Sequence, residues 1–219
     1  MKGYAENKAY GTVEPIKGTN PRQLYEHQKQ AMENLSIVDT EEKYSTLVVL
    51  PTGGGKTYTA STWLLKHAID RNKKILWLAH RHTLLEQAAE SFQKYAYATT
   101  IPHTSSFTYR IVSGAVAHDR AVDIKAKDNI LIASKDSIGR NLPALNSWLK
   151  GEDELYLVID EAHHSTAKTY RRVIEYLQKK VKHLKLIGLT ATPFRTGEEG
   201  AGQLGNLYLN GMPEHRGIA

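Results

Sequence analysis

Residues 48–61 read VVLPTGGGKTYTAS: an apolar run, a proline, three consecutive glycines and then Lys56-Thr57. Glycine weakens any helix or strand that contains it, so three in a row indicate a place where the backbone itself must be accessible. The pattern predicts a buried strand, a glycine-rich turn and a helix that begins at the lysine. In that arrangement, backbone N–H groups of the turn and of the first helical turn point at one place and attract an anion such as phosphate.

The turn fits the phosphate-binding loop (P-loop) of nucleoside-triphosphate enzymes. Side chains at 53–55 would block the phosphates, Lys56 would reach the β- and γ-phosphates, and the Thr57 hydroxyl would hold Mg²⁺. The match to the general pattern G-x-x-x-x-G-K-[ST] is partial, because Leu50 stands at the first glycine position. On this pattern alone, a flexible turn with an incidental lysine remains the alternative.

A second polar cluster follows another apolar run, in LYLVIDEAHH at 155–164. The run would deliver Asp160 and Glu161 at the carboxyl edge of a strand, where the ligands of parallel sheets collect. Asp160 would bind Mg²⁺ through water, and Glu161 would orient or deprotonate the attacking water. The plain alternative is an acidic start to the next helix, but the pairing with a P-loop favours catalysis. A zinc protease site is rejected, because the motif HExxH is absent.

The remaining chain alternates between apolar runs and helical patterns. Strands are expected at 46–50, 74–79, 107–113, 129–134, 154–160 and 184–190. Helices are expected at 20–36, 56–69, 83–95, 136–149 and 166–181, the first with Asn20 and Pro21 as its cap and first residue, the fourth interrupted near Pro143. Continuous apolar strands are covered on both faces, so the predicted fold class is α/β, with a doubly wound parallel sheet in a three-layer α/β/α arrangement.

Composition excludes several classes of protein. The chain has 219 residues and no cysteine, which rules out disulfides and cysteine-based zinc sites. No apolar run approaches the ~20 residues needed to span a bilayer, and the N-terminus lacks the apolar segment of a secretory signal. We therefore expect no membrane partner and a cytoplasmic location. The formal net charge of +6 favours an anionic partner such as nucleic acid or nucleotide, although a slightly basic soluble protein is the plain alternative.

The motifs together resemble those of superfamily 2 helicases and translocases of the DEAD/DEAH-box type. PTGGGKT at 51–57 resembles that group's P-loop, which does not keep the first glycine. DEAH at 160–163 resembles motif II, and TATP at 190–193 resembles motif III in the form common among DNA-directed members.

Three further stretches extend the resemblance over residues 20 to 195. LAHRHTLLEQ at 78–87 resembles motif Ia, and ILIASKDSI at 130–138 resembles the strand-edge motif that follows it. LYEHQKQAM at 24–32 resembles the helix that carries the adenine-reading glutamine. The DEAHH box, the AHR of motif Ia and TATPFR are most similar to the branch that contains type I and type III restriction motor subunits and excision-repair relatives.

The resemblance implies an organisation and two cofactors. Residues 21–195 would form an ATP-binding, RecA-like P-loop NTPase lobe, preceded by a flexible leader at 1–20. Residues 196–219 would be a linker or the start of a missing second lobe. The cofactors would be ATP and Mg²⁺. A second RecA-like lobe of the same polypeptide would supply arginine fingers, so the isolated chain is expected to bind ATP·Mg²⁺ weakly and hydrolyse it slowly or not at all.

The resemblance also implies a role for each matching position. The residues expected to bind the nucleotide are Gln28, Thr52, Gly53, Gly54, Gly55, Lys56 and Thr57. Thr57 and Asp160 would hold Mg²⁺, and Glu161 and Lys56 would be catalytic. Nucleic-acid phosphates would contact His80, Arg81, Ser134 and Lys135. Coupling between the two sites would involve His163, Thr190 and Thr192.

Plainer roles stay open for several of these residues. Gln28 could be an exposed helical glutamine, and Arg81 a surface salt-bridge partner. Ser134 and Lys135 could belong to an ordinary loop, and the three coupling residues could serve local packing.

Two functions follow from the resemblance. The first is an ATP-dependent helicase or translocase acting on nucleic acid, with DNA expected, in a restriction, phage-defence or repair system whose other subunits would be partners. The second is a nucleotide-gated nucleic-acid clamp or sensor that never unwinds. The intact set of Lys56, Asp160 and Glu161 favours the first, because a scaffold has no need of a water-activating carboxylate. An unrelated P-loop ATPase, such as a transporter subunit, would leave TATP unexplained.

Overall fold

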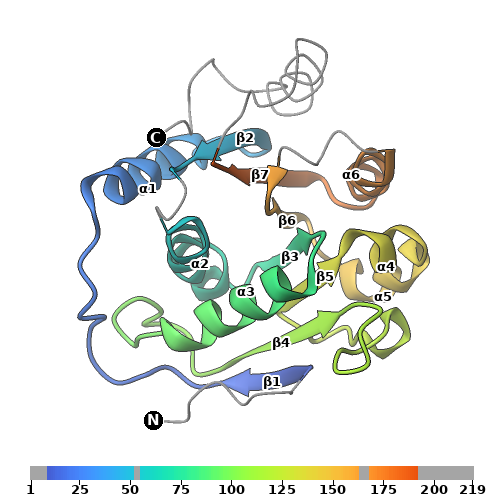
Figure 1. Cartoon of the computed structure of the whole chain (residues 1–219), viewed down its shortest axis with the longest axis horizontal. Coiled ribbons are helices and arrows are strands. Elements are labelled where there is room, and N and C mark those ends of the chain that lie inside the picture. Colours follow the sequence, from blue (N-terminus) through green and yellow to red (C-terminus); the bar gives the residue numbers. More distant parts are fainter. Residues whose placement is uncertain (1–8, 52–54, 163–167, 192–219) are drawn as a thin grey trace.

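A seven-stranded sheet with helices on both faces forms the core of the protein (Figure 1). The computed structural model describes residues 9–51, 55–162 and 168–191. None of the helices in these ranges has both the length and the apolar character that crossing a bilayer requires.

The strands are mostly parallel and confirm the six that the sequence predicts, to within two residues. Their bounds are β1 Tyr10–Val13, β2 Tyr44–Val49, β3 Lys74–Ala79, β4 Phe107–Val112, β5 Ile130–Ser134, β6 Glu154–Ile159 and β7 His183–Thr190. Their order across the sheet is β1-β4-β5-β3-β6-β7-β2, and only the pair of β1 and β4 is antiparallel among these strands.

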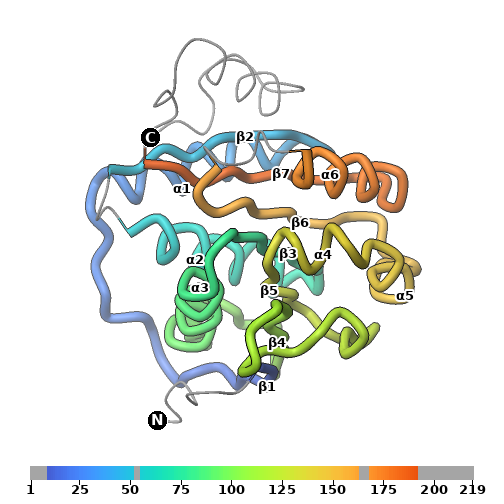
Figure 2. Tube along the Cα trace, turned by 45° about the vertical axis from the view of Figure 1, so that its right-hand side comes forward, coloured from blue at the N-terminus to red at the C-terminus, as the bar shows by residue number. Residues whose placement is uncertain are grey.

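The helices form two layers on opposite faces of the sheet (Figure 2). Their bounds are α1 Glu26–Val38, α2 Lys56–His67, α3 His82–Lys94, α4 Lys135–Gly139, α5 Asn146–Leu149 and α6 Lys168–Lys180, with short 3-10 turns at Ile69–Arg71, Ala121–Asp123 and Leu142–Leu145. Helices α1 to α3 pack into one apolar core and α4 to α6 into the other. The expected interruption near Pro143 is confirmed, because a 3-10 turn separates α4 from α5.

The central strands show why their sequences are continuously apolar. Along β3, Ile75 and Trp77 belong to the core under α1 to α3, whereas Leu76 and Leu78 belong to the core under α4 to α6. Successive side chains of a strand point to opposite faces, so a strand that is covered on both sides needs apolar residues at every position.

The structure differs from the expected flexible leader at residues 1–20. Tyr10–Val13 form strand β1, which pairs with β4, and Gly11 lies opposite Tyr109. A Cβ at Gly11 would come within 2.9 Å of the Tyr109 ring, so the ring occupies the space that the missing side chain leaves. A four-residue strand with this glycine carries too little alternation to be recognised from sequence. Residues 1–8 lie outside the described residues, and the expected domain limits at 20/21 and 195/196 stay predictions.

Helix α1 begins later than the sequence predicts. Its N-cap is Tyr25 rather than Asn20, so the predicted start at Asn20 and Pro21 is wrong. The Asn20 side chain accepts a hydrogen bond from the Arg22 N–H at 2.9 Å and donates one to the Tyr58 hydroxyl at 3.0 Å. These bonds hold the segment before the helix against α2, a use of Asn20 that depends on a residue 38 positions away.

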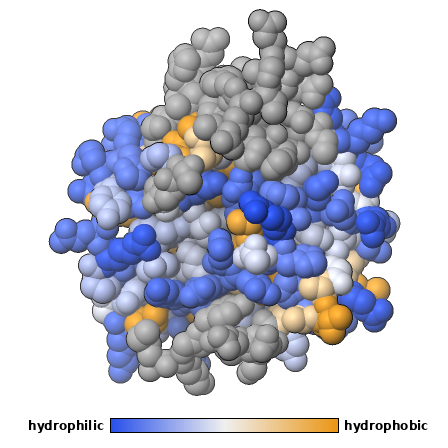
Figure 3. Space-filling model, in the orientation of Figure 1, coloured by the Kyte–Doolittle hydropathy of each residue, from blue (hydrophilic) through white to orange (hydrophobic). Residues whose placement is uncertain are grey.

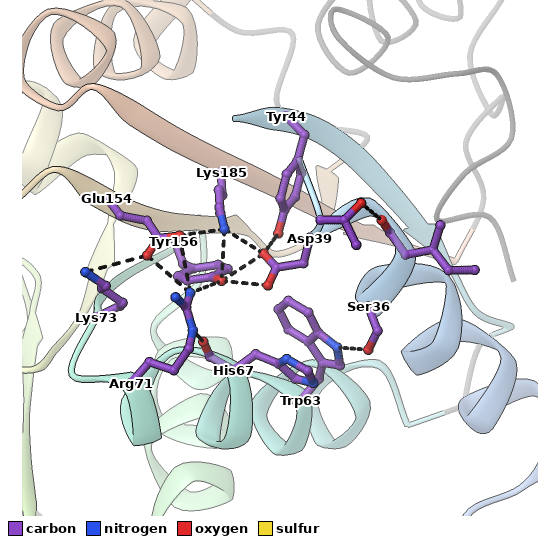
Figure 4. Close-up of polar contacts among 12 residues, drawn as sticks. Ser36, Asp39, Tyr44, Trp63, His67, Arg71, Lys73, Glu154, Tyr156 and Lys185 are labelled. Atoms are coloured by element: carbon purple, nitrogen blue, oxygen red, sulfur yellow. Dashed lines mark hydrogen bonds and ion pairs between the residues drawn. The ribbon is translucent and has the colours of Figure 1, made fainter. Parts of the chain in front are cut away.

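At the amino edge of the sheet, a largely buried polar network joins the end of α1, the 3-10 turn after α2 and three strands (Figure 4). We call it the basal network, and its members are Asp39, Tyr44, Arg71, Glu154, Tyr156 and Lys185. Lys185, which is 4% exposed, lies 3.0 Å from Asp39 and 2.5 Å from Glu154. Arg71 donates to the Tyr156 hydroxyl at 2.8 Å, and that hydroxyl donates to Asp39 at 2.8 Å.

Within the basal network, Glu154 is ionised and the Tyr156 hydroxyl is neutral. Burial alone would raise the pKa of Glu154, but hydrogen bonds from Lys185 and Arg71 outweigh burial and lower that pKa. Burial and the nearby Asp39 carboxylate raise the pKa of Tyr156, which keeps its hydroxyl a neutral donor. Pairing offsets the cost of burying Lys185, Asp39 and Glu154, so the network fixes the amino ends of β6 and β7 relative to the end of α1 and the turn after α2.

Candidate nucleotide site and nucleic-acid edge

The carboxyl edge of the sheet gathers most of the predicted site residues. Strands β5, β3, β6, β7 and β2 are neighbours in this order and run parallel. Ser134 is paired with Ala79, so the residues after β3 and β5 lie side by side. The segment after β6 carries Asp160, and Thr190 ends β7 beside Val49 of β2. Motifs far apart in the sequence therefore meet on one edge, as ligand sites of parallel sheets do.

Gly55 occupies a position that only glycine fits easily. It caps α2 with φ +73°, a left-handed conformation that side chains rarely adopt. A Cβ on Gly55 would also lie 2.4 Å from Nε2 of Gln28 on α1. Gly55 is the last glycine of the predicted phosphate-binding turn, which we call the phosphate turn. Its lack of a side chain allows both the left-handed backbone and the close approach of α1.

Lys56 and Glu161 meet, although 105 residues separate them. The Lys56 ammonium lies 3.3 Å from Oε1 of Glu161, and both side chains are less than one-fifth exposed. Glu161 has φ +55°, which is uncommon for a residue other than glycine and costs about 1–3 kcal/mol. The strained backbone directs the chain out of β6 at the point where the carboxylate reaches the lysine of the phosphate turn.

Asp160 is the most deeply buried carboxylate of the site, at 1% exposure. Its Oδ1 accepts the Glu161 N–H at 2.9 Å, whereas Oδ2 is buried and has no hydrogen-bond partner among the described residues. Burial raises the pKa of Asp160 to about 6, against the attraction of Lys56, and the nearby Glu161 carboxylate adds to the rise. A buried carboxylate oxygen of this kind is what a hard cation prefers as a ligand.

Gln28 is buried at 1% exposure, so the alternative of an exposed helical glutamine is wrong. Its Oε1 accepts the Tyr25 N–H at 3.0 Å and so satisfies the N-cap backbone donor of α1. The cap fixes the side chain in the first turn of α1, beside Gly55. The structure thus places Gln28 next to the phosphate turn, and its contact with adenine stays a prediction.

Arg22 is a neighbour of this site that the sequence reasoning missed. Its guanidinium lies 3.7 Å over the Tyr58 ring and donates to the Tyr95 hydroxyl at 2.7 Å. The same guanidinium would lie 3.8 Å from a Cβ on Gly55. An arginine in an irregular segment gives no local signal, because its position depends on Tyr58 of α2 and Tyr95 at the end of α3.

The predicted nucleic-acid contacts lie along the same edge. His80 follows β3, and the exposed Arg81 is the N-cap of α3. Ser134 is buried and caps α4, because its hydroxyl accepts the Ser137 N–H at 3.2 Å. Lys135 lies 3.7 Å from Asp136. Ser134 thus has a structural use, and the contacts of all four predicted residues with phosphate stay predictions.

Thr190 joins the end of β7 to the segment before the phosphate turn. It is fully buried, and its carbonyl accepts the Leu50 N–H at 3.1 Å. This bond directly connects the end of β7, which carries the predicted coupling residue Thr190, to the segment between β2 and the phosphate turn. Thr57 is partly exposed in the first turn of α2. The other predicted residues, Thr52, Gly53, Gly54, His163 and Thr192, lie outside the described residues.

Curated relatives of this chain are much longer proteins. The DEAD-box ATP-dependent DNA helicase Fancm of Drosophila melanogaster is 28% identical over 182 residues, which cover 81% of this chain and 12% of the relative. The ATP-dependent DNA helicase MPH1 of Saccharomyces cerevisiae is 28% identical over 164 residues, which cover 72% of this chain and 15% of the relative. The chain thus corresponds to a small part of either protein.

Solved structures show the same fold. The helicase domain of Pyrococcus furiosus Hef superposes with a TM-score of 0.55 and 24% identity, over 85% of this chain and 36% of that one. The DUF1998 helicase MrfA superposes with a TM-score of 0.62 and 20% identity, over 86% of this chain and 30% of that one. These likenesses confirm the predicted RecA-like α/β fold.

The family follows from a match that covers most of the chain. Residues 22–195 match the family model described as the Res subunit of type III restriction enzymes. This range contains Gln28, the phosphate turn and the acidic pair, and it confirms the resemblance that the motifs suggested. The chain therefore belongs to the family of type III restriction enzyme Res subunits.

Proposed function

We propose that this chain is the ATP-binding and hydrolysing first lobe of an ATP-dependent helicase or translocase that acts on DNA. The observation that carries the proposal is the meeting of Lys56 and Glu161 at 3.3 Å beside the buried Asp160. The family match and two relatives that are named as ATP-dependent DNA helicases support it. A restriction or repair setting and a cytoplasmic location belong to the same proposal.

The Lys56–Glu161 ion pair gives the nucleotide a defined first step. Phosphates that enter the turn would compete with Glu161 for the Lys56 ammonium and release the carboxylate. The released Glu161 would then be available to orient or deprotonate water. A partly exposed pair of this kind contributes about 1 kcal/mol, so a triphosphate can displace it easily.

We propose a Mg²⁺ site because of the oxygen ligands that Asp160 and Thr57 offer. Asp160 offers a buried oxygen without a hydrogen-bond partner among the described residues, and Thr57 offers a hydroxyl at the start of α2. Mg²⁺ binds through one or two carboxylates together with substrate phosphates, and the residues present fit that requirement. Bound there, the ion would offset charge on the transferred phosphoryl group. With a pKa of about 6, Asp160 is mostly ionised at pH 7 and its carboxylate would be available to the cation.

The nucleic acid would lie across the edge that carries His80, Arg81 and Lys135. Contacts from such residues to sugar and phosphate position a strand without reading its sequence. The bond between Thr190 and Leu50 would transmit the state of the nucleotide to neighbouring strands. A second RecA-like lobe is proposed to close over ATP, and the length of the relatives supports it. Robust DNA-stimulated ATP hydrolysis by this chain alone would refute that requirement.

The test uses the 219-residue chain and a fluorescent, non-hydrolysable ATP analogue with Mg²⁺. Lys56→Ala is expected to weaken binding at least tenfold, because the phosphates lose their cation. Glu161→Gln is expected to retain or improve binding, since it frees Lys56 from its partner.

In the complete protein, Glu161→Gln is expected to abolish phosphate release and strand displacement while binding persists. Normal hydrolysis by the Glu161→Gln variant would contradict its assignment as the base. Hydrolysis by the wild type without any translocation or strand displacement would favour the clamp or sensor instead.

A further inference from the structure

The positive charge of the chain is concentrated in one segment. Residues 168–182 hold six lysines and arginines and one acid, a net charge of +5, against +6 for the whole chain. The rest of the sequence is therefore almost neutral. The cations are Lys168, Arg171, Arg172, Lys179, Lys180 and Lys182.

Five of these cations lie on the outer side of helix α6, and Lys182 lies two residues after its end. All six are exposed, whereas Tyr170, Val173, Ile174 and Leu177 of the same helix are buried in the core. No ion pair within the described ranges involves any of the six. Figure 3 shows hydrophilic side chains along the margin where α6 lies in Figure 1. We call this exposed side the α6 basic face.

The α6 basic face adjoins the predicted nucleic-acid edge. Arg172 donates to the carbonyl of Gly139, the last residue of α4, at 2.9 Å. The ammonium of Lys135, the first residue of α4, lies 5.7 Å from the centre of the Tyr170 ring. Helices α4 and α6 therefore lie side by side (Figures 1 and 2), and the basic face continues from the edge that carries Lys135.

A membrane surface fits this helix less well than a polyanion does. Helices that lie on membranes expose an apolar face for insertion into lipid. The large exposed apolar residues of the described chain are Tyr10, Tyr25, Ile37, Val116 and Val122, and none of them lies on α6. The helix thus offers charge without an exposed apolar face, which is the character of a phosphate-backbone contact.

We propose that the α6 basic face is a second contact for the phosphate backbone of nucleic acid, continuous with the edge at Lys135. The proposal rests on the proposed function and extends its nucleic-acid path beyond His80, Arg81, Ser134 and Lys135. A helix of 13 residues is about 20 Å long, which matches the length of several nucleotide steps. Arg172 is anchored to α4, Lys180 lies over the Tyr176 ring and Lys182 follows the helix, so the contacts left free on α6 are Lys168, Arg171 and Lys179.

The test is a salt titration of DNA binding by fluorescence anisotropy. The probe is a labelled duplex with a single-stranded overhang, between 50 and 200 mM salt. The triple variant K168Q/R171Q/K179Q is expected to bind at least tenfold more weakly than wild type at the lower salt concentration. The slope of log K against log salt should decrease in magnitude by about 2–3, because each lost phosphate contact lowers the magnitude of the slope by roughly 0.9.

The matched control is K66Q/K125Q/K127Q, which removes the same charge from exposed lysines outside α6 and the nucleic-acid edge. It is expected to keep wild-type affinity and slope, and thermal unfolding should show that both variants are folded. An equal loss in both variants, an unchanged slope in the α6 variant, or wild-type binding to phosphatidylserine vesicles but not to DNA would each overturn the proposal. Nucleotide binding that still depends on Lys56 would leave the proposed function standing in every one of these cases.

Discussion

The two edges of the sheet use buried charge in opposite ways. At the amino edge, Lys185 contacts both Asp39 and Glu154, and the charges of the basal network are paired. At the carboxyl edge, Asp160 is equally buried but keeps one oxygen without a hydrogen-bond partner among the described residues. Paired charges fix a structure, whereas an incompletely satisfied carboxylate costs stability and can accept a ligand. The contrast separates the edge that holds the fold together from the edge that we propose to bind the nucleotide.

The largest effect is expected at the amino edge. Lys185→Met removes the cation shared by Asp39 and Glu154 and leaves both carboxylates buried without it. Breaking a buried pair in this way costs about 3–5 kcal/mol of unfolding free energy. Urea unfolding measures this loss, and Lys66→Met, an exposed lysine outside the basal network, is the control with an expected change of about 0.5 kcal/mol or less. A loss below about 1 kcal/mol in Lys185→Met would remove the distinction between the two edges.

The carboxyl edge is expected to respond in the opposite direction. Asp160 has a raised pKa in the folded protein, so its ionised form opposes folding above pH 6. Asp160→Asn removes that charge and is expected to raise the unfolding free energy at pH 7 by up to about 3 kcal/mol, while it weakens Mg²⁺-dependent nucleotide binding. Glu152→Gln, a carboxylate outside the site, is the control. Lower stability of Asp160→Asn would show that the carboxylate is structural.

The same charge predicts a pH dependence. A carboxyl group whose pKa is higher in the folded state binds its proton more tightly there, so its cost is absent below about pH 4 and complete above about pH 6. The stability difference between Asp160→Asn and wild type should therefore grow as pH rises from 4 to 7. Urea unfolding at several pH values measures it, and a difference that is constant over this range would contradict the raised pKa.

A substitution in the phosphate turn is expected to have an intermediate effect on stability, and Gly18 offers a matched control. Gly55→Ala places a methyl group in a left-handed conformation and 2.4 Å from Gln28, so a loss of about 1–3 kcal/mol and weaker nucleotide binding are expected. Gly18 has φ +92° with no atom near its Cβ position, so Gly18→Ala reports the backbone cost alone. Equal losses of unfolding free energy in the two variants would mean that the contact with Gln28 does not contribute to the cost of Gly55→Ala.

The smallest effect concerns Arg22. Arg22→Ala removes a cation stacked on Tyr58 at an exposed position, which is worth about 0.5–1 kcal/mol. Nucleotide affinity should decrease by more than this change in stability explains, because Arg22 adjoins Gly55. Arg140→Ala, at the exposed arginine that follows the last residue of α4, is the control for both measurements. An affinity equal to that of the control would exclude Arg22 from the site.

Sequence patterns predicted the parts of this lobe that depend on local order. The six parallel strands follow from continuous apolar runs, and the carboxyl-edge positions of Asp160 and Lys56 follow from where those runs end. The meeting of Lys56 and Glu161 was implied by the pairing of two motifs, and the structure shows it at 3.3 Å.

Features that depend on distant neighbours could not be predicted in the same way. Strand β1 needs Tyr109 beside Gly11, and the late start of α1 needs the hydroxyl of Tyr58 for Asn20. The basal network joins residues from Asp39 to Lys185, each of which looks like an ordinary polar residue in its own segment. Tertiary contacts determine these positions, and no periodicity in the local sequence indicates them.

A crystal structure of this chain with Mg²⁺ and a non-hydrolysable ATP analogue tests the central claim most directly. We expect the phosphates at Lys56, with the Lys56–Glu161 pair broken, and the metal ion facing Asp160 and Thr57. A nucleotide bound away from Lys56, or a metal ion beyond the reach of Asp160, would contradict it.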